Sequence, residues 1–179
     1  MAPKSTIYHF SIDLSDMDRG VYQSLKLPVA LHPSESPEFM LTRVLAWALE
    51  FEEGIAFSPG VGSPEEPTLS IKGLDGTYNS WIEIGAPDSE RLHKATKIAQ
   101  RVAVYCHRSA DNVFQQLLQK QIYRGTEVPL YSFEEGFISL LVKALERRNK
   151  MSVSRSDQTI YVALNGQDLS SHIMERRLA

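Results

Sequence analysis

Two glutamates could bind one divalent cation if the chain folds as its turn residues predict. Asp75-Gly76 lies between two short apolar runs and is typical of a two-residue hairpin turn. That register places Thr68 opposite Glu83 and makes Glu66 a diagonal neighbour of Glu83, roughly 7 Å away. Carboxylates at this spacing suit Mg²⁺ or Mn²⁺, which take oxygen ligands. The hairpin is therefore a candidate metal site.

Alternation along the second strand of this hairpin leaves two interpretations of Glu83. Ile82 and Ile84 fall on the face expected to be core, whereas Trp81 and Glu83 fall on the other. That other face is either a functional site, where a buried carboxylate needs a partner, or an ordinary solvent-facing side of the sheet. On the same face, Trp81 could stack a nucleic-acid base or pack under a neighbouring element.

A third acid could come from the preceding helix, predicted over residues 36–50. Glu38 lies one turn before Leu41, near the buried stripe of that helix, and Glu35 is a weaker substitute. Alternatively, Glu38 is only a first-turn acid that favours the helix dipole. His32 comes just before this helix and is either a polar binding residue or a loop histidine that stabilises the turn.

The elements that must position these side chains follow from hydrophobic periodicity and turn residues. Asp88 is a predicted helix cap, and the strand–helix–strand order around it implies a parallel pair with a right-handed crossover. The fold class is α/β (α+β), a mixed central sheet with flanking helices in a single domain over residues 1–179. Besides the hairpin, strands are predicted over 5–14, 21–31, 102–107, 128–132, 151–155 and 159–164, and helices over 36–50, 88–101, 109–121 and 134–148.

Composition narrows the setting of the protein. A single cysteine, Cys106, allows no internal disulfide, and the N-terminus lacks an apolar signal core, so we expect a cytoplasmic protein. The longest apolar run, Val44–Leu49, is too short to span a bilayer, which predicts no membrane partner. Net charge is −3 overall, which argues against a generic polyanion binder.

The charge is nevertheless divided unevenly along the chain. Residues 1–90 hold 5 Lys/Arg and 14 Asp/Glu, a net charge of −9, whereas residues 91–179 hold 14 and 8, a net charge of +6. This division fits either an acidic site beside a phosphate-facing surface or an ordinary solvated surface. The basic residues that could contact phosphates are Lys143, Arg147, Arg148, Lys150, Arg155, Arg176 and Arg177.

Several short motifs together resemble the YaeQ family, over most of the chain and most clearly in residues 5–108. The resemblance implies a variation on the restriction-endonuclease-like core, whose active site is written PD-(D/E)xK. It implies added hairpins at both ends of that core and no established activity. The motifs are His32-Pro33-Ser34-Glu35, Glu38, Met40, Arg43, Leu45-Ala46-Trp47, Glu66-Pro67, Trp81-Ile82-Glu83-Ile84-Gly85, Pro87-Asp88 and Arg91 through Lys94-Ala95.

Carried over residue by residue, the resemblance assigns candidate roles. Glu66 takes the place of the first acid and Glu83 that of the second, with Glu38 as the helix acid, and together they form the candidate metal ligands. Gly85 stands where the catalytic lysine belongs. Because that lysine can migrate to the following helix in variants of the fold, Lys94 is the candidate replacement, although its helical position also suits a plain surface lysine. His32, Trp81 and Arg91 are the candidate binding residues.

Two functions follow from these residues. The first is a nuclease-like protein with a Mg²⁺ or Mn²⁺ site that acts on or binds nucleic acid, with Glu66, Glu83 and Lys94 as its catalytic group. Phosphodiester hydrolysis needs a metal, an activated water and stabilisation of transition-state charge. The second is an interaction protein, bound to a protein partner or a nucleic acid, that keeps the fold without catalysis. The absence of a lysine at Gly85 and the position of Lys94 are the features that distinguish these two functions.

Overall fold

The chain forms a mixed α/β structure of two compact units. A computed structural model describes residues 4–58 and 65–178. One unit, here called unit 1, combines Met1–Leu49 with Phe133–Met174, and the other, unit 2, combines Glu50–Ser132 with Glu175–Ala179. Each unit is therefore built from two stretches of chain. Independent folding of residues 1–179 as one domain stays a prediction.

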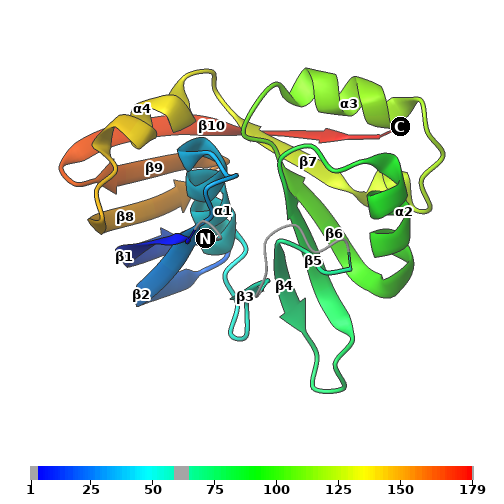
Figure 1. The fold of residues 1–179 in the computed structure, drawn as a ribbon, viewed down its shortest axis with the longest axis horizontal. Helices are drawn as coiled ribbons and strands as arrows, with labels where there is room; N and C mark the ends of the chain where they lie inside the picture. Colours follow the sequence, from blue (N-terminus) through cyan, green and yellow to red (C-terminus); the bar gives the residue numbers. More distant parts are fainter. Residues whose placement is uncertain (1–3, 59–64, 179) are drawn as a thin grey trace. The chain divides into compact units, whose positions relative to one another are not determined.

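Unit 1 contains five neighbouring strands of the sheet, with helices against them (Figure 1). The strand order is β2-β1-β8-β9-β10, in which β1 and β8 are parallel and the other neighbours are antiparallel. The elements of this unit are β1 (Thr6–Asp16), β2 (Val21–Leu31), α1 (Pro37–Leu49), α4 (Phe137–Ala144), β8 (Arg148–Ser156), β9 (Thr159–Leu164) and β10 (Gln167–Arg177), the last of which ends in unit 2.

Hydrophobic periodicity explains the core of unit 1. Along β1, Phe10, Ile12 and Leu14 are buried while the residues between them are exposed, as a strand with one covered face requires. The stripe predicted for α1 is confirmed, because Leu41 and Val44 are fully buried and α1 packs against β2, β8 and α4. The sheet of unit 1 thus has one apolar face beneath helices and one outward face.

Unit 2 holds the predicted hairpin and the predicted parallel crossover. Its strand order is β7-β6-β5-β4-β3; the helix α2 connects β5 to β6, and these two strands are parallel, as predicted. Strands β6 and β7 are parallel as well. The elements are β3 (Ala56–Phe57), β4 (Leu69–Lys72), β5 (Tyr78–Ile84), α2 (Ser89–Ile98), β6 (Ala99–Tyr105), α3 (Ala110–Leu118), the 3₁₀ turn η1 (Gly125–Glu127) and β7 (Pro129–Phe133).

Two helices are shorter than the sequence predicts, and one long strand was missed. Helix α2 ends at Ile98 rather than near residue 101, because residues 99–101 pair with β5. Helix α4 covers only Phe137–Ala144, since β8 already begins at residue 148 and pairs with β1. Strand β10 was missed, although Asn165-Gly166 before it, with φ angles of 51° and 89°, is the turn chemistry typical of a hairpin.

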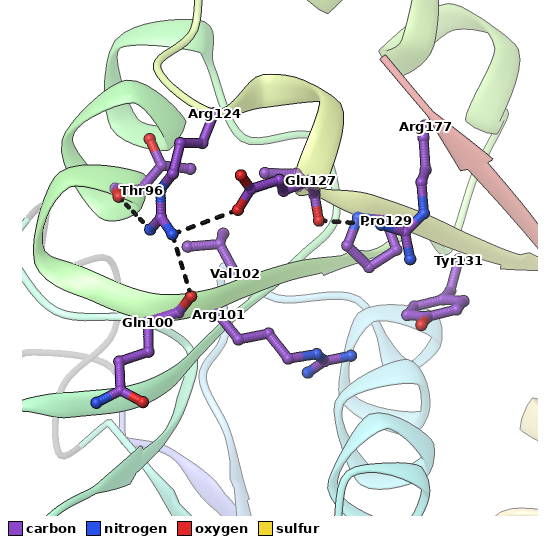
Figure 2. Close-up of a pocket in the computed structure, with 10 residues that line it drawn as sticks. Thr96, Gln100, Arg101, Val102, Arg124, Glu127, Pro129, Tyr131 and Arg177 are labelled. Atoms are coloured by element: carbon purple, nitrogen blue, oxygen red, sulfur yellow. Dashed lines mark hydrogen bonds and ion pairs between the residues drawn. The ribbon is translucent and has the colours of Figure 1, made fainter. Parts of the chain in front are cut away.

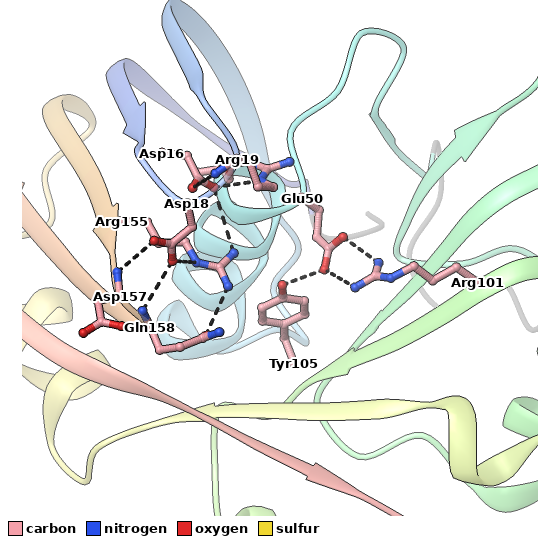
Figure 3. A network of polar contacts seen from close by, with 10 residues as sticks. Asp16, Asp18, Arg19, Glu50, Arg101, Tyr105, Arg155, Asp157 and Gln158 are labelled. Atoms are coloured by element: carbon pink, nitrogen blue, oxygen red, sulfur yellow. Dashed lines mark hydrogen bonds and ion pairs between the residues drawn. The ribbon is translucent and has the colours of Figure 1, made fainter.

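A buried carboxylate fastens the β1–β2 turn in unit 1 (Figure 3). Asp16 has no exposed surface, and it accepts hydrogen bonds from the backbone N–H of Arg19 at 3.1 Å and from its Nε at 2.7 Å. Arg155 on β8 lies 3.9 Å from the same carboxylate. Asp18 in the turn accepts the backbone N–H of Asp157 at 2.8 Å. The turn therefore binds the β8–β9 hairpin through charge and backbone contacts.

We predict that Asp16→Ala lowers the free energy of unfolding by about 2 kcal/mol, because it removes the buried carboxylate that accepts hydrogen bonds from the Arg19 backbone and guanidinium. The matched control is Asp13→Ala on the outward face of the same strand, where the carboxylate accepts a hydrogen bond from Ser24 at the exposed surface. That control should stay within about 0.5 kcal/mol of wild type. Urea denaturation measures both, and equal losses for the two variants would contradict the stabilising role of Asp16.

Candidate functional site

Glu83 on β5 is a buried carboxylate with hydrogen-bond donors from the protein around it. Its side chain belongs to a residue that is only 3% exposed. Its Oε1 accepts hydrogen bonds from Trp81 Nε1 at 2.6 Å and from Arg91 Nε at 2.7 Å. Burial raises the pKa of Glu83, against the opposing effect of Trp81, Arg91 and a hydrogen bond from Thr68. The contact with Thr68 fits the register predicted for the hairpin.

The predicted pairing of the hairpin is confirmed where it matters for Glu83. Leu69 pairs with Ile82 and Ser70 with Trp81, the register deduced from the Asp75-Gly76 turn, and a bulge after Ile71 changes the pairing only near the tip. Because β-strand faces alternate, this register fixes Trp81 and Glu83 on one side.

That side of β5 is not solvated, so the solvent-facing interpretation of Glu83 is wrong. Trp81 is 1% exposed and lies in an apolar cluster with Leu92 and Ala95 of α2. Ile82 on the opposite face is also fully buried. Trp81 packs beneath a neighbouring element, as its packing interpretation predicted, and it offers no exposed ring to a base.

Arg91 supplies the positive charge beside Glu83. It lies in the first turn of α2, where its backbone N–H is bound by the N-cap Asp88 at 2.7 Å. Its guanidinium donates through Nε to Glu83 and through Nη2 to the backbone carbonyl of Glu66, and it lies 5.9 Å from the Trp81 ring centroid. The Arg91 guanidinium therefore bridges Glu83 and Glu66, the two positions that the sequence predicted as metal-binding acids.

The other predicted catalytic residues of unit 2 have separate partners. The Glu66 carboxylate accepts a hydrogen bond from the Ser58 hydroxyl at 3.2 Å. The Lys94 ammonium pairs with Glu65, and both side chains are largely exposed, at 51% and 71%. Lys94 thus has the surroundings of a surface lysine, the alternative that sequence left open.

His32 and Glu38 belong to unit 1. The Nδ1 of His32 lies 2.6 Å from the Ser34 hydroxyl and accepts the Ser34 backbone N–H at 3.1 Å, so the histidine stabilises its turn. Glu35 accepts the His32 backbone N–H at 2.9 Å and lies 3.6 Å from Arg43. Glu38 is half-buried in the first turn of α1. Over residues 4–58 and 65–178, no three His, Cys, Asp or Glu side chains are grouped as a metal site.

Sequence reasoning missed a second ion pair in unit 2, which is half-buried (Figure 3). Arg101 binds Glu50 with two hydrogen bonds of 2.6 and 3.0 Å, and the Tyr105 hydroxyl donates to the same carboxylate at 2.7 Å. Burial and the negative charge of Glu50 raise the pKa of Tyr105. Glu50 and Arg101 are far apart in sequence, and no local pattern joins them.

An arginine-lined pocket of about 230 Å³ lies beside this pair (Figure 2). Arg124 donates to the carbonyl oxygens of Thr96 and Ala99 at 2.6 and 2.7 Å, so it caps the end of α2. Arg177 pairs with Glu175 at 2.8 Å, and Arg101 is held by Glu50. Because each arginine has an acidic neighbour or a carbonyl partner, this pocket carries little uncompensated positive charge.

The fold and site define a mixed α/β protein in which a buried glutamate is neutralised by an arginine of the next helix. The family model described as YaeQ protein matches residues 1–173 of this chain. The chain belongs to the YaeQ family.

Individual comparisons agree with this membership. The chain is 29% identical over 164 residues to the uncharacterized protein YaeQ of Salmonella typhi, and the alignment covers 91% of each chain. It is 26% identical over 174 residues to that of Escherichia coli K12, covering 97% and 96%. The crystal structure of YaeQ protein from Pseudomonas syringae superposes with a TM-score of 0.87 at 31% identity, covering 96% of this chain and 95% of that one. The YaeQ protein of Xanthomonas axonopodis pv. citri, at 24% identity, shares the fold with a TM-score of 0.88, covering 98% and 99%.

We predict that Arg91→Met lowers the free energy of unfolding at pH 7 by about 3 kcal/mol, because it leaves Glu83 buried without its cation. The pKa of Glu83 is already raised above 4.5 in the folded protein. Its stabilising effect is therefore complete below the unfolded pKa and lost as pH rises through the folded pKa. Removing Arg91 enlarges that loss, so the difference from wild type should shrink as pH is lowered toward 4.5.

Two variants serve as controls for this pH series. Lys94→Met removes an exposed charge from the same helix and should leave the unfolding midpoint unchanged. Arg91→Met/Glu83→Gln removes both charges, so its stability should depend less on pH than that of Arg91→Met. A destabilisation by Arg91→Met that is constant between pH 4.5 and 8 would show that packing, and not the Glu83 charge, is what Arg91 contributes.

Proposed function

We propose that the protein binds nucleic acid without hydrolysing it, and that it keeps a variation of the restriction-endonuclease-like PD-(D/E)xK core whose acidic positions are no longer catalytic. The observation that carries the proposal is the bonding of Glu83, whose carboxylate accepts from Arg91 and Trp81 at 2.7 and 2.6 Å. A guanidinium occupies the carboxylate that a divalent cation would need. The relation to the nuclease core is supported by the order of α1, the β4–β5 hairpin, α2 and β6 along the chain.

The chemistry of hydrolysis explains why this bonding matters. A metal polarises the phosphate and generates the attacking water, and a further cation stabilises the transition state. In the present arrangement Glu83 is a poor ligand for a resident Mg²⁺ or Mn²⁺, because the Arg91 guanidinium already neutralises its charge and Oε1 accepts from two protein donors. Gly85 supplies no lysine on β5, and Lys94 is paired with Glu65 at the surface. The protein therefore retains the acidic positions and lacks free groups for catalysis there.

Exposed basic side chains support nucleic acid as the partner, because electrostatic attraction to phosphates supplies most of non-specific nucleic-acid binding. Among the basic candidates, Arg155, Arg176 and Arg177 are held in ion pairs with Asp18, Asp111 and Glu175. Arg148 and Lys150 are exposed on β8 and are available.

A cytoplasmic setting agrees with this partner. Cys106 is buried and free, and burial raises the pKa of its thiol to about 12, which suits a structural residue in a reducing compartment. No described helix is long and apolar enough to cross a membrane.

We predict that millimolar Mn²⁺ leaves the melting temperature of the wild type unchanged, because Arg91 already neutralises Glu83. Arg91→Ala removes the guanidinium and opens room for a cation, so Mn²⁺ should stabilise this variant. A free Mn²⁺ concentration of tenfold the dissociation constant would add about 1.4 kcal/mol. Arg91→Ala/Glu83→Gln is the matched control and should lose the response. Differential scanning fluorimetry with and without Mn²⁺ measures all three.

The same proteins are then incubated with single-stranded and double-stranded DNA and RNA in Mn²⁺. The wild type should bind without cleaving, and Lys94→Met should behave identically. Cleavage by the wild type that is abolished in Glu66→Gln/Glu83→Gln would overturn the proposal in favour of a metal-dependent nuclease using Glu38, Glu66 and Glu83. Absence of binding to every nucleic acid would overturn it in favour of a protein that binds a protein partner.

A further inference from the structure

The outward face of the unit 1 sheet has two neighbouring rows made mostly of small and hydroxyl-bearing side chains. The strand registers place its residues in rows that cross the sheet. Two rows run through all five strands from β2 to β10, and every member is exposed or half-buried. They are Tyr22, Ser15, Ser154, Tyr161 and Ser170, and next to them Ser24, Asp13, Ser152, Ala163 and Asp168.

Small side chains leave this face open. Ser152, Ser154 and Ala163 line a pocket of about 330 Å³, together with Tyr161 and Asp168. Tyr161 is 51% exposed and Tyr22 is 61% exposed. Two tyrosine rings thus stand on an otherwise low surface, where a planar group could stack on them.

Positive charge lies beside the pocket on the same face. The next row toward the start of β1 contains Lys26, Ser11 and Lys150, and the row after it contains Pro28, His9 and Arg148. Lys26, Lys150 and Arg148 are exposed, and none is in an ion pair within the described residues. Three cations on neighbouring rows suit a chain of phosphates.

The geometry points to this face as a binding surface for single-stranded nucleic acid, an inference that rests on the proposed function and names where the nucleic acid binds. Lys26, Lys150 and Arg148 contact the backbone phosphates, while Tyr161 and Tyr22 stack bases. Successive rows on one face are about 6.6 Å apart along a strand, so the tyrosine row lies about 13 Å from the lysine row, a distance that more than one nucleotide must span.

The acids on this face favour a strand with accessible bases over a duplex. Asp13 and Asp168 repel phosphates but accept hydrogen bonds from base amino groups and sugar hydroxyls. In a duplex the bases are stacked on one another and cannot lie on a tyrosine ring, whereas an unpaired strand exposes them. The cations at one end of this face and the tyrosine rings at the other therefore favour an unpaired strand over a duplex.

The test uses the full-length protein and fluorescein-labelled single-stranded oligonucleotides of twelve nucleotides, with a duplex of the same length for comparison. Fluorescence anisotropy is recorded between 50 and 200 mM salt. Tyr161→Ala should weaken single-strand binding about tenfold without changing the salt dependence, since stacking is uncharged. Lys26→Gln/Lys150→Gln should reduce the slope of log affinity against log salt by about 1.4, because each of the two lost phosphate contacts contributes about 0.7. The matched control is Lys97→Gln/Lys120→Gln, two exposed lysines of unit 2, which should bind as wild type does.

The outcomes separate this inference from the proposed function. If the wild type binds nucleic acid and the two unit 1 variants bind equally well, the surface is wrong while the proposed function stands. If the duplex binds more tightly than the single strand and Tyr161→Ala has no effect, the single-strand inference is overturned. If the wild type binds neither, both fail together. Circular dichroism melts confirm that each variant is folded.

Discussion

The ion pair between Glu83 and Arg91 is the interaction on which the interpretation of unit 2 depends. A carboxylate on a strand buried on both faces is costly unless it is hydrogen-bonded and neutralised. Glu83 is bonded by a guanidinium from α2, an indole N–H from its own strand and the hydroxyl of Thr68, the residue just before β4. Because Arg91 sits in the first turn of α2, the N-cap at Asp88 positions it. The helix cap and the buried charge are thus parts of one arrangement.

This arrangement has a direct consequence for chemistry. A metal-dependent nuclease needs carboxylates whose oxygens remain available to the cation and a further positive group near the phosphate. Here Oε1 of Glu83 is bonded to protein donors. Gly85 has no side chain that could act as the positive group, and Lys94 pairs with the exposed carboxylate of Glu65. The same residues that resemble an active site in sequence can therefore hold a strand and a helix together. Nucleic acid must then bind at another surface, and we infer that this surface is the outward sheet face of unit 1.

Sequence patterns predicted the parts of the fold that depend on local chemistry. The Asp75-Gly76 turn fixed the register of β4 and β5, apolar spacing located α1, and Asp88 marked the start of α2. The partner of Glu83 could not be read in this way, since Arg91 was visible only as part of a family motif and its direction depends on how α2 packs on the sheet. The Glu50–Arg101 pair likewise forms only through tertiary packing. Strand β10 was missed because its buried positions include Ser171, which weakens the apolar alternation, although Asn165-Gly166 preceded it.

A crystal of the protein grown with millimolar Mn²⁺, measured at a wavelength where manganese scatters anomalously, shows directly whether Glu83 binds a metal. We expect no anomalous peak near Glu83, and we expect Arg91 Nε to stay within hydrogen-bonding distance of its carboxylate. A peak within about 2.5 Å of carboxylate oxygens of both Glu66 and Glu83, with the Arg91 guanidinium displaced, would contradict it and establish a resident metal site.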